Sequence, residues 1–376
     1  MRIRWLSLVV FLVAVLGSSP VRAQNVTITP LGAQAGEFCV GDRALLFEDP
    51  TGVRVLIAPG RTVNGSGDGR LPNPSGTTGG VHVLLIDHPH VDHLGDVFHT
   101  NCGGTASTAF AFPLEGNAPE IAAVHKSAVL VGGELPDFFT QKIRNVNGGV
   151  APAGCPATGL DNTLTVPRTT PCVGVIRGGT RTVLFGTATK GVKITTIPAF
   201  HAAGASRTHV DELRATNDQA AAIVADPGVP FGLTGYAGSE TGYIMRFSNG
   251  LSVLWTGDSG LIGDWETQAK FYKVNLAVVH GGDLFTMGPD EAAFAVKSLI
   301  KPRTVIPEHF NQVSTASGAI VAGTRLERFK QQLNPGSSKS KKSSKDDDDD
   351  RNRGPVKMIV PLSGVPISCD GQGNCN

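Results

Sequence analysis

Short stretches in the first part of the chain alternate between hydrophobic and polar positions, or are apolar throughout, as β-strands do. Residues 81–86 form a nearly continuous apolar run, which is typical of a strand buried on both faces. A loop rich in Gly, Asn, Pro and Ser over residues 59–80 leads into that run. The sequence therefore predicts an N-terminal sheet with strands over residues 26–31, 44–47, 53–57 and 81–86.

The second half of the chain repeats the strand pattern and then alternates strands with helices. Residues 276–279 and 305–306 are expected strands, and Pro289 starts an expected helix between them that runs to Leu299. This alternation indicates an α/β fold with a second sheet. Further helices are predicted around residues 95–99, 135–143 and 320–333, and further strands over residues 182–185, 192–198, 242–247, 251–255, 356–361 and 365–368.

Two segments depart from these patterns. Residues 145–180 show no clear periodicity and contain two cysteines, so we expect an irregular insertion. Residues 337–353 join a Ser/Lys run to five consecutive Asp residues and predict a solvated low-complexity loop. A calcium site is the alternative for the acidic run, but the spaced ligands and glycine of a calcium loop are missing. We expect residues 24–376 to form a single domain with these two interruptions.

The first 23 residues have the pattern of a secretory signal peptide. Arg2 and Arg4 precede an apolar run, and Ala23 provides a small residue at the expected cut. An uncleaved membrane anchor is the alternative, but about a dozen apolar residues fall short of the roughly 20 that span a bilayer. We therefore expect a secreted or periplasmic protein that begins at Gln24 and keeps no stable membrane anchor.

Composition limits the class of protein and of partner. Of 376 residues, 40% are hydrophobic, which is enough for a sizeable core and excludes a fully disordered chain. Charged residues make up only 17% and the formal net charge is +1, so the basic footprint of a nucleic-acid-binding protein is missing. We expect a small-molecule substrate and no nucleic-acid partner.

The six cysteines include no Cys-x-x-Cys pair. In an oxidising compartment such cysteines form disulfides more readily than thiolate metal sites. Proximity along the chain favours Cys155 with Cys172 and Cys369 with Cys375, which leaves Cys39 with Cys102. Other pairings, and reduced thiols, stay open from the sequence.

Residues 86–96 carry the chemistry of the chain. They read Ile-Asp-His-Pro-His-Val-Asp-His-Leu-Gly-Asp. His88 and His90, two apart at a strand end, can point the same way, while Asp92 and His93 follow on the turn into a helix and can face a second position. The alternative is that these rings lie on a surface turn and bind no metal. It fits poorly, because imidazoles buried after an apolar strand need partners. The segment predicts metal ligands, with room for two ions.

This His-x-His-x-Asp-His pattern, followed by Leu-Gly-Asp, resembles the signature of the metallo-β-lactamase superfamily of metal-dependent hydrolases. Downstream motifs agree in order: Ile-Pro-Ala-Phe-His ending at His201, Trp-Thr-Gly-Asp-Ser around Asp258, and Val-Ile-Pro-Glu-His ending at His309. The stretch that begins at Gly281-Gly282-Asp283 resembles the ascorbate-6-phosphate lactonase-like branch of that superfamily.

The resemblance implies a four-layer αβ/βα sandwich, in which two mixed sheets carry helices outside and metals at one edge. Two divalent ions are implied, and each set of ligands leaves positions open for water or substrate. Zinc suits a histidine-rich site with carboxylates, while Mn or Fe is also compatible. The implied ligands are His88, His90 and His201 for the first metal, Asp92, His93 and His309 for the second, and Asp258 as the bridge.

The activity implied is hydrolysis of a small-molecule ester, lactone or phosphoester by a metal-bound hydroxide. Asp92 could also orient the hydroxide or accept its proton, and Asp258 is the other predicted catalytic residue. A di-iron redox protein of the same fold is one alternative, although no flavodoxin-like or cysteine-cluster segment is seen. A noncatalytic metal-dependent binding protein is the other, although such a protein has no need of two open metal positions.

Three residues near the site depart from the family pattern. Ala58 stands where relatives usually carry an Asp that supports the metal histidines, which leaves the orientation of these rings an open question. Asp87 stands where Thr or Ser is common. His280 ends a predicted strand at the active edge, where relatives often have Pro or an apolar residue. It is a candidate substrate contact, with a structural imidazole as the alternative.

Overall fold

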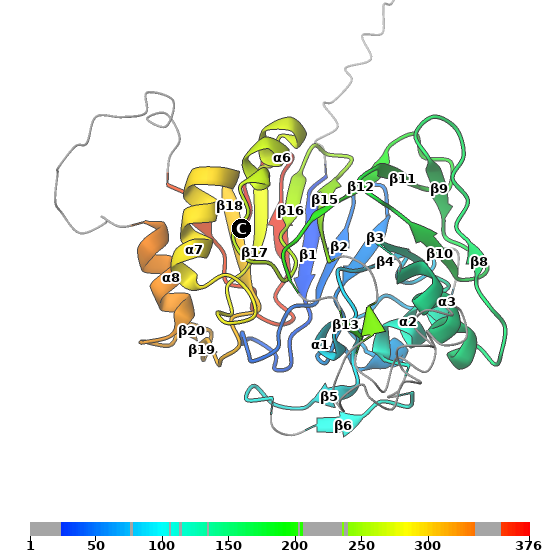
Figure 1. Ribbon diagram of the computed structural model, residues 1–376, viewed down its shortest axis with the longest axis horizontal. Helices are drawn as coiled ribbons and strands as arrows, with labels where there is room; N and C mark the ends of the chain where they lie inside the picture. The colour runs from blue at the N-terminus through cyan, green and yellow to red at the C-terminus, as the bar shows by residue number, and fades with distance from the viewer. Residues whose placement is uncertain are drawn as a thin grey trace, which may run out of the picture.

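The computed structural model describes residues 24–75, 78–104, 107–112, 115–133, 135–201, 204–205, 235–236, 240–334 and 355–376. Two eight-stranded sheets lie face to face with helices on their outer sides, so the fold has four layers (Figure 1). The predicted αβ/βα sandwich is therefore confirmed. The expected signal peptide 1–23 and low-complexity loop 337–353 lie outside the described residues. No helix in the described ranges is long and apolar enough to cross a membrane.

The first sheet contains the strands that the sequence predicts at the start of the chain. All four residues of its strand β4 (Val83–Ile86) are buried, as the continuous apolar run predicts. The strand order is β22 (Ile367–Cys369), β1 (Val26–Pro30), β2 (Leu45–Glu48), β3 (Arg54–Ile57), β4 (Val83–Ile86), β7 (Ala128–Val131), β10 (Cys172–Val175) and β8 (Ala153–Gly154).

The second sheet is mixed, with parallel strand pairs at both ends and antiparallel pairs between them. Strands β16, β17 and β18 run parallel, so their carboxyl ends meet at one edge, where polar residues follow each strand. The strand order is β21 (Lys357–Met358), β18 (Thr304–Glu308), β17 (Leu276–His280), β16 (Ser252–Trp255), β15 (Thr241–Arg246), β12 (Gly191–Pro198), β11 (Thr180–Phe185) and β9 (Thr163–Val166).

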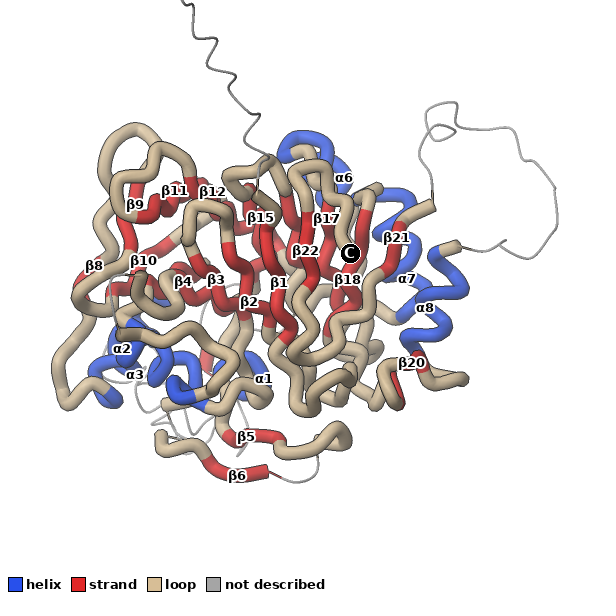
Figure 2. Tube along the Cα trace, turned by 180° about the vertical axis from the view of Figure 1, so that it is seen from behind, coloured by secondary structure: helices blue, strands red, loops and turns tan. Residues whose placement is uncertain are grey.

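Three apolar clusters hold the layers together. Phe47, Tyr243 and Trp255 belong to the cluster between the sheets. Helices α2 (Asn117–His125) and α3 (Leu135–Val146) cover the first sheet, and α6 (Asp264–Tyr272), α7 (Pro289–Phe294) and α8 (Arg325–Leu333) cover the second (Figure 2). The smaller elements are η1 (Gly65–Gly67), α1 (Val91–Leu94), β5 (Val97–His99), β6 (Ser107–Ala109), β13 (Gly204–Ala205), β14 (Gly235–Tyr236), η3 (Ala295–Ile300), β19 (Thr315–Ala316) and β20 (Ala319–Ile320).

Several local predictions were wrong or missed. The helix expected over residues 95–99 is instead strand β5, because the helical turn α1 ends at Leu94 and the following Gly95 has a φ of 87°, which stops a helix. The helix expected from residue 320 begins at Arg325, where Thr324 caps it by accepting a hydrogen bond from the Glu327 amide. Helices α2 and α6 and strand β7 were missed.

The segment 145–180, expected to be irregular, supplies strands to both sheets. Within it, β8 and β10 extend the first sheet, whereas β9 pairs with β11 of the second. Its strands are short and lie at sheet ends, where pairing with neighbouring backbone rather than a clear sequence period stabilises them. The segment is therefore an integral part of the sandwich.

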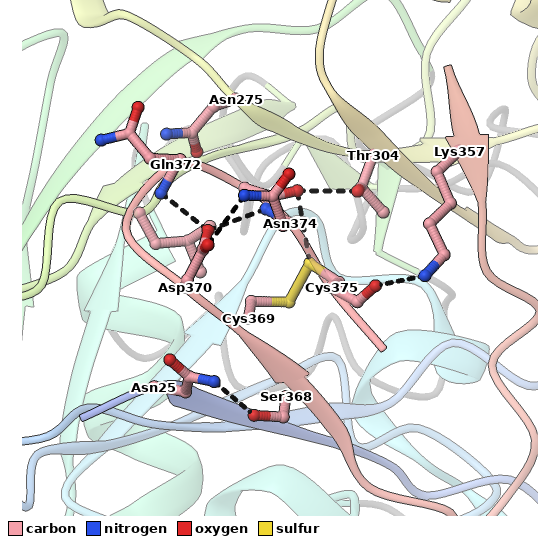
Figure 3. Close-up of a disulfide and its surroundings, with 12 residues drawn as sticks. Asn25, Asn275, Thr304, Lys357, Ser368, Cys369, Asp370, Gln372, Asn374 and Cys375 are labelled. Carbon is pink, nitrogen blue, oxygen red and sulfur yellow. Dashed lines mark hydrogen bonds between the residues drawn. A yellow bond between two sulfur atoms is a disulfide. The ribbon is translucent and has the colours of Figure 1, made fainter. Parts of the chain in front are cut away.

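All three predicted disulfides are present: Cys39–Cys102, Cys155–Cys172 and Cys369–Cys375. The last one closes a C-terminal loop that contacts both sheets (Figure 3). Strand β22 pairs with β1, while Thr304 of β18 donates a hydrogen bond to the carbonyl of Gly373 at 2.7 Å. The C-terminal segment thus connects the two sheets at one edge of the sandwich.

Candidate metal centre

The seven predicted metal ligands lie together at one edge of the two sheets. His88 and His90 follow β4, and α1 carries Asp92 and His93. The other three follow strands of the second sheet: His201 comes after β12, Asp258 after β16 and His309 after β18. Each of these loops directly follows a hydrogen-bonded strand, and that strand fixes where the loop begins.

His88, His90 and His201 form the first cluster, in which their ligand atoms lie within 4.8 Å of one another. Nδ1 of His90 is 2.9 Å from Nε2 of His88 and 3.3 Å from Nε2 of His201. A tetrahedral zinc ion with bonds of about 2.0–2.1 Å would hold two nitrogen ligands about 3.3 Å apart. The spacing of these nitrogens is therefore close to that of a metal site.

The second cluster contains a carboxylate that also faces the first. Its members are Asp92, His93, Asp258 and His309, again within 4.8 Å. Oδ2 of Asp258 lies 3.1 Å from Nε2 of His309 and 3.3 Å from Nε2 of His93. The same oxygen is 3.8 Å from Nε2 of both His88 and His201. Asp258 thus stands between the two clusters, which is the position expected of a bridging ligand.

Buried nitrogen atoms without partners test whether the clusters fit metal ions. Nε2 of His93 and Nε2 of His309 are buried, and they face Oδ2 of Asp258 at 3.3 and 3.1 Å without the geometry of a hydrogen bond. Buried polar atoms are rarely left unpaired, and a cation bound between these nitrogens and Asp258, in place of ring protons, would satisfy them. Imidazole nitrogen and carboxylate oxygen are also the donors that zinc prefers. The residues present fit divalent metals.

The electrostatics of the rings and carboxylates favour cation binding. Burial lowers the pKa of His90 to about 4 and also lowers the pKa of His201, so both rings are neutral near pH 7. Burial alone would lower the pKa of His93 too, but Asp87 and Asp258 raise it to about 10. Burial would raise the pKa of Asp258, but His309 and His93 hold it well below its usual range. A cation entering the second cluster would therefore displace a proton from His93.

His280 lies behind the clusters rather than in open space. Its side chain is fully buried, and its Nδ1 is 2.8 Å from Oδ1 of Asp258. Burial lowers the pKa of His280 to about 4, so the neutral ring donates its Nδ1 proton to the carboxylate. The ring is therefore placed to orient Asp258, and the substrate contact expected from the sequence stays a prediction.

Two further residues at the centre were not predicted as site residues. Arg43, which is buried, donates a hydrogen bond to Asp92. Asp87 contacts both His88 and His93. Nothing in the sequence around Arg43 marks it, whereas Asp87 was visible as a departure from the family pattern. Both contacts depend on segments that meet only in the folded protein.

No protein-family model matches the chain. A UPF0173 metal-dependent hydrolase of Pelotomaculum thermopropionicum is 36% identical over 229 residues, which cover 61% of this chain and 67% of that protein. The chain belongs to the UPF0173 metal-dependent hydrolase family. Another UPF0173 metal-dependent hydrolase, from Cupriavidus necator, is 27% identical over 309 residues, or 82% of this chain and 83% of that protein.

As a UPF0173 protein the chain is a metal-dependent hydrolase, and the predicted metallo-β-lactamase superfamily is confirmed. The ascorbate-6-phosphate lactonase-like branch stays a prediction. Among solved structures, the metallo hydrolase Igni18 of Ignicoccus hospitalis is 17% identical with a TM-score of 0.48, covering 92% of this chain and 99% of that one. The metallo-β-lactamase fold protein YhfI of Bacillus subtilis is 11% identical with a TM-score of 0.43, over 92% and 99% of the two chains. These scores are low, and the family assignment rests on the sequence relatives.

Proposed function

We propose that this UPF0173 member is an exported hydrolase that holds two divalent metal ions and acts on a small-molecule ester, lactone or phosphoester. The observation that carries the proposal is the position of Asp258 between two clusters of ligand atoms. In the proposal the first ion is held by His88, His90 and His201, the second by Asp92, His93 and His309, and Asp258 contacts both.

Divalent ions held by these residues would supply two kinds of chemistry: acidification of a water molecule at neutral pH, and stabilisation of negative charge on the substrate oxygen. The two carboxylates would have different roles. Asp258 is buried and hydrogen-bonded to His280, so it holds its position. The side chain of Asp92 is 28% exposed, so its carboxylate is accessible to water and is the group proposed to accept a proton from it.

The donor set favours zinc, with Mn or Fe as compatible ions, because it combines imidazole rings with carboxylates. The near-neutral net charge of +1 supports a small substrate rather than a nucleic acid. Export to the periplasm or the medium is supported by the pairing of all six cysteines in disulfides, which persist in oxidising compartments.

The first experiment is to measure metal content by elemental mass spectrometry on protein purified without chelator or a metal-affinity tag. We expect about two equivalents of Zn, Mn or Fe per chain. His90→Ala should remove the first ion and His309→Ala the second, whereas Asp258→Ala should weaken both. His125→Gln is the matched control, because this buried histidine bonds Ser66 and Val81 and belongs to neither cluster. Folded wild-type protein that takes up no metal would overturn the proposal.

The substrate and the location need separate tests. A screen of lactones, phosphodiesters and β-lactams on the two-metal protein should find hydrolysis that His90→Ala abolishes. Two bound irons with electron transfer and no hydrolysis would instead favour the redox alternative, and metal-dependent ligand capture without turnover would favour a binding protein. N-terminal sequencing of protein from the exported fraction should start at Gln24, and retention of residues 1–23 would contradict the predicted cleavage.

A further inference from the structure

One oxygen of Asp87 contacts a histidine from each cluster. Asp87 follows β4 and is 1% exposed. Its Oδ1 lies 2.7 Å from Nδ1 of His93 and 3.3 Å from Nδ1 of His88. On the far side of these rings, Nε2 of His88 is 2.9 Å from Nδ1 of His90, and Nε2 of His93 is 3.3 Å from Oδ2 of Asp258. Asp87 therefore lies within ion-pair distance of both rings on the side opposite to the metal clusters, although neither Nδ1 has the geometry of a hydrogen bond to it.

Groups of the second sheet hold Asp87 in this place. The amide and hydroxyl of Thr241 donate to the Asp87 carbonyl at 3.1 and 3.3 Å, and Nε1 of Trp255 donates to Oδ2 at 3.5 Å. Gly257 lies against the same oxygen with a φ of 64°, and a Cβ there would come within 3.2 Å of it. The carboxylate is thus confined between the sheets, next to the residue that precedes Asp258.

We propose that Asp87 is a positioning residue that orients His88 and His93 together and thereby couples the two metal clusters. This inference rests on the proposed function, in which those two histidines are metal ligands. The neighbouring strand end offers no substitute: β3 runs parallel to β4, and the residue after it is Ala58, whose buried side chain is a methyl group. Asp87 supplies the carboxylate that this strand end lacks.

The physical reason lies in the two nitrogens of each ring. A carboxylate beside Nδ1 keeps the proton on that nitrogen, leaves the lone pair on Nε2 and fixes the angle of the ring. Asp87 Oδ1 lies within ion-pair distance of both rings and also accepts the backbone amide of His88 at 3.1 Å, which fixes the carboxylate between them. A single anion behind both rings makes each Nε2 a better donor to a cation.

A residue that orients ligands of both ions should change the binding of both, whereas a ligand of one ion should change the binding of that ion alone. Metal-free full-length protein would be titrated with Co²⁺ against a competing chelator, with the visible absorption of bound Co²⁺ as the readout. We expect wild type to bind two ions and Asp87→Ala to bind both about 10- to 100-fold more weakly, with altered absorption bands. Asp87→Asn keeps the shape and an acceptor oxygen but loses the charge, so its loss should be smaller. It also serves as the test variant if Asp87→Ala does not fold.

Two controls define the outcomes. His309→Ala should weaken one ion only, and Asp49→Asn should weaken neither, because this buried carboxylate bonds Thr51 and Ser248 away from the clusters. Two ions with wild-type affinity and spectrum in both Asp87 variants, or the loss of one ion alone, would overturn the coupling role while leaving the proposed function intact. Absence of Co²⁺ binding in wild type would overturn the proposed function and this inference with it.

Discussion

Arg43 donates a hydrogen bond to Asp92, and this ion pair connects the loop before β2 to the helical turn that carries two of the predicted metal ligands. Arg43 is 3% exposed, so its charge is compensated inside the protein. Burial would raise the pKa of Asp92, but Arg43 and His309 hold it well below its usual range. Burial and Asp42 raise the pKa of nearby Glu308 well above its usual range, and Arg43 opposes that rise. Arg43 is therefore a buried cation surrounded by acidic side chains.

Replacing Arg43 by Met should destabilise the metal-free protein by about 3 kcal/mol, because removing one partner of a buried pair leaves the other charge uncompensated. A divalent ion at Asp92 would replace part of the missing positive charge, so the loss should be smaller in metal-loaded protein. Urea unfolding with and without chelator measures both values. Arg328→Met, which removes an exposed ion pair with Asp290, should leave the midpoint unchanged. Equal losses for Arg43→Met in both metal states would contradict this account.

His280 should act on metal binding through Asp258. His280→Ala removes the donor to Oδ1 of Asp258 and should weaken metal binding about 10- to 100-fold. His280→Asn retains an N–H donor near the Nδ1 position and should restore most of the affinity. Chelator competition measures the affinities. A substrate-contacting His280 would behave differently, with normal metal affinity and a raised KM in His280→Ala.

The three disulfides should differ in their contribution to stability according to loop length. Cys39–Cys102 spans 63 residues and Cys369–Cys375 spans 6, so loop-closure entropy assigns them about 4 and about 2 kcal/mol. Chemical unfolding of variants in which both cysteines of one disulfide are replaced by Ser would show which disulfide contributes more to the free energy of unfolding. The longer disulfide also fixes the loop that bears Arg43, because the Cys39 amide donates to Asp42 at 2.8 Å. Its loss should therefore also weaken metal binding, whereas loss of the C-terminal disulfide should not.

Asp68 gives a pH dependence that is separate from the metal centre. Burial would raise its pKa, but Arg70 and the amide of Asn64 lower it below the usual value. A depressed folded pKa stabilises the protein above the unfolded value of about 3.9, and this contribution disappears as the pH falls through the folded value. Asp68→Asn should thus cost about 1–3 kcal/mol at pH 7, and the difference from wild type should shrink below about pH 4. A difference that stays constant from pH 7 to pH 3 would contradict the assignment.

Local sequence determined much of the fold and the metal centre. A continuous apolar run predicted β4, since a strand buried on both faces has no polar positions. The dense group His88, His90, Asp92 and His93 predicted metal ligands, because their spacing after a strand brings donors together without help from distant residues. Segments with a weak period, such as residues 145–180, were misjudged, because their strands exist only through pairing with neighbours in the two sheets.

Contacts between distant segments were decided by the tertiary structure alone. The sequence showed that Ala58 offers no carboxylate to the histidines, but only the packing of β4 against the second sheet brings the Asp87 oxygen to both rings. It likewise showed His280 at a strand end, but not that the ring faces Asp258. The pairing of Arg43 with Asp92 could not be predicted from the sequence, because 49 residues separate them along the chain. Local patterns encode which donors are present, whereas ring orientation and charge compensation arise when separate strands converge at one edge of the sandwich.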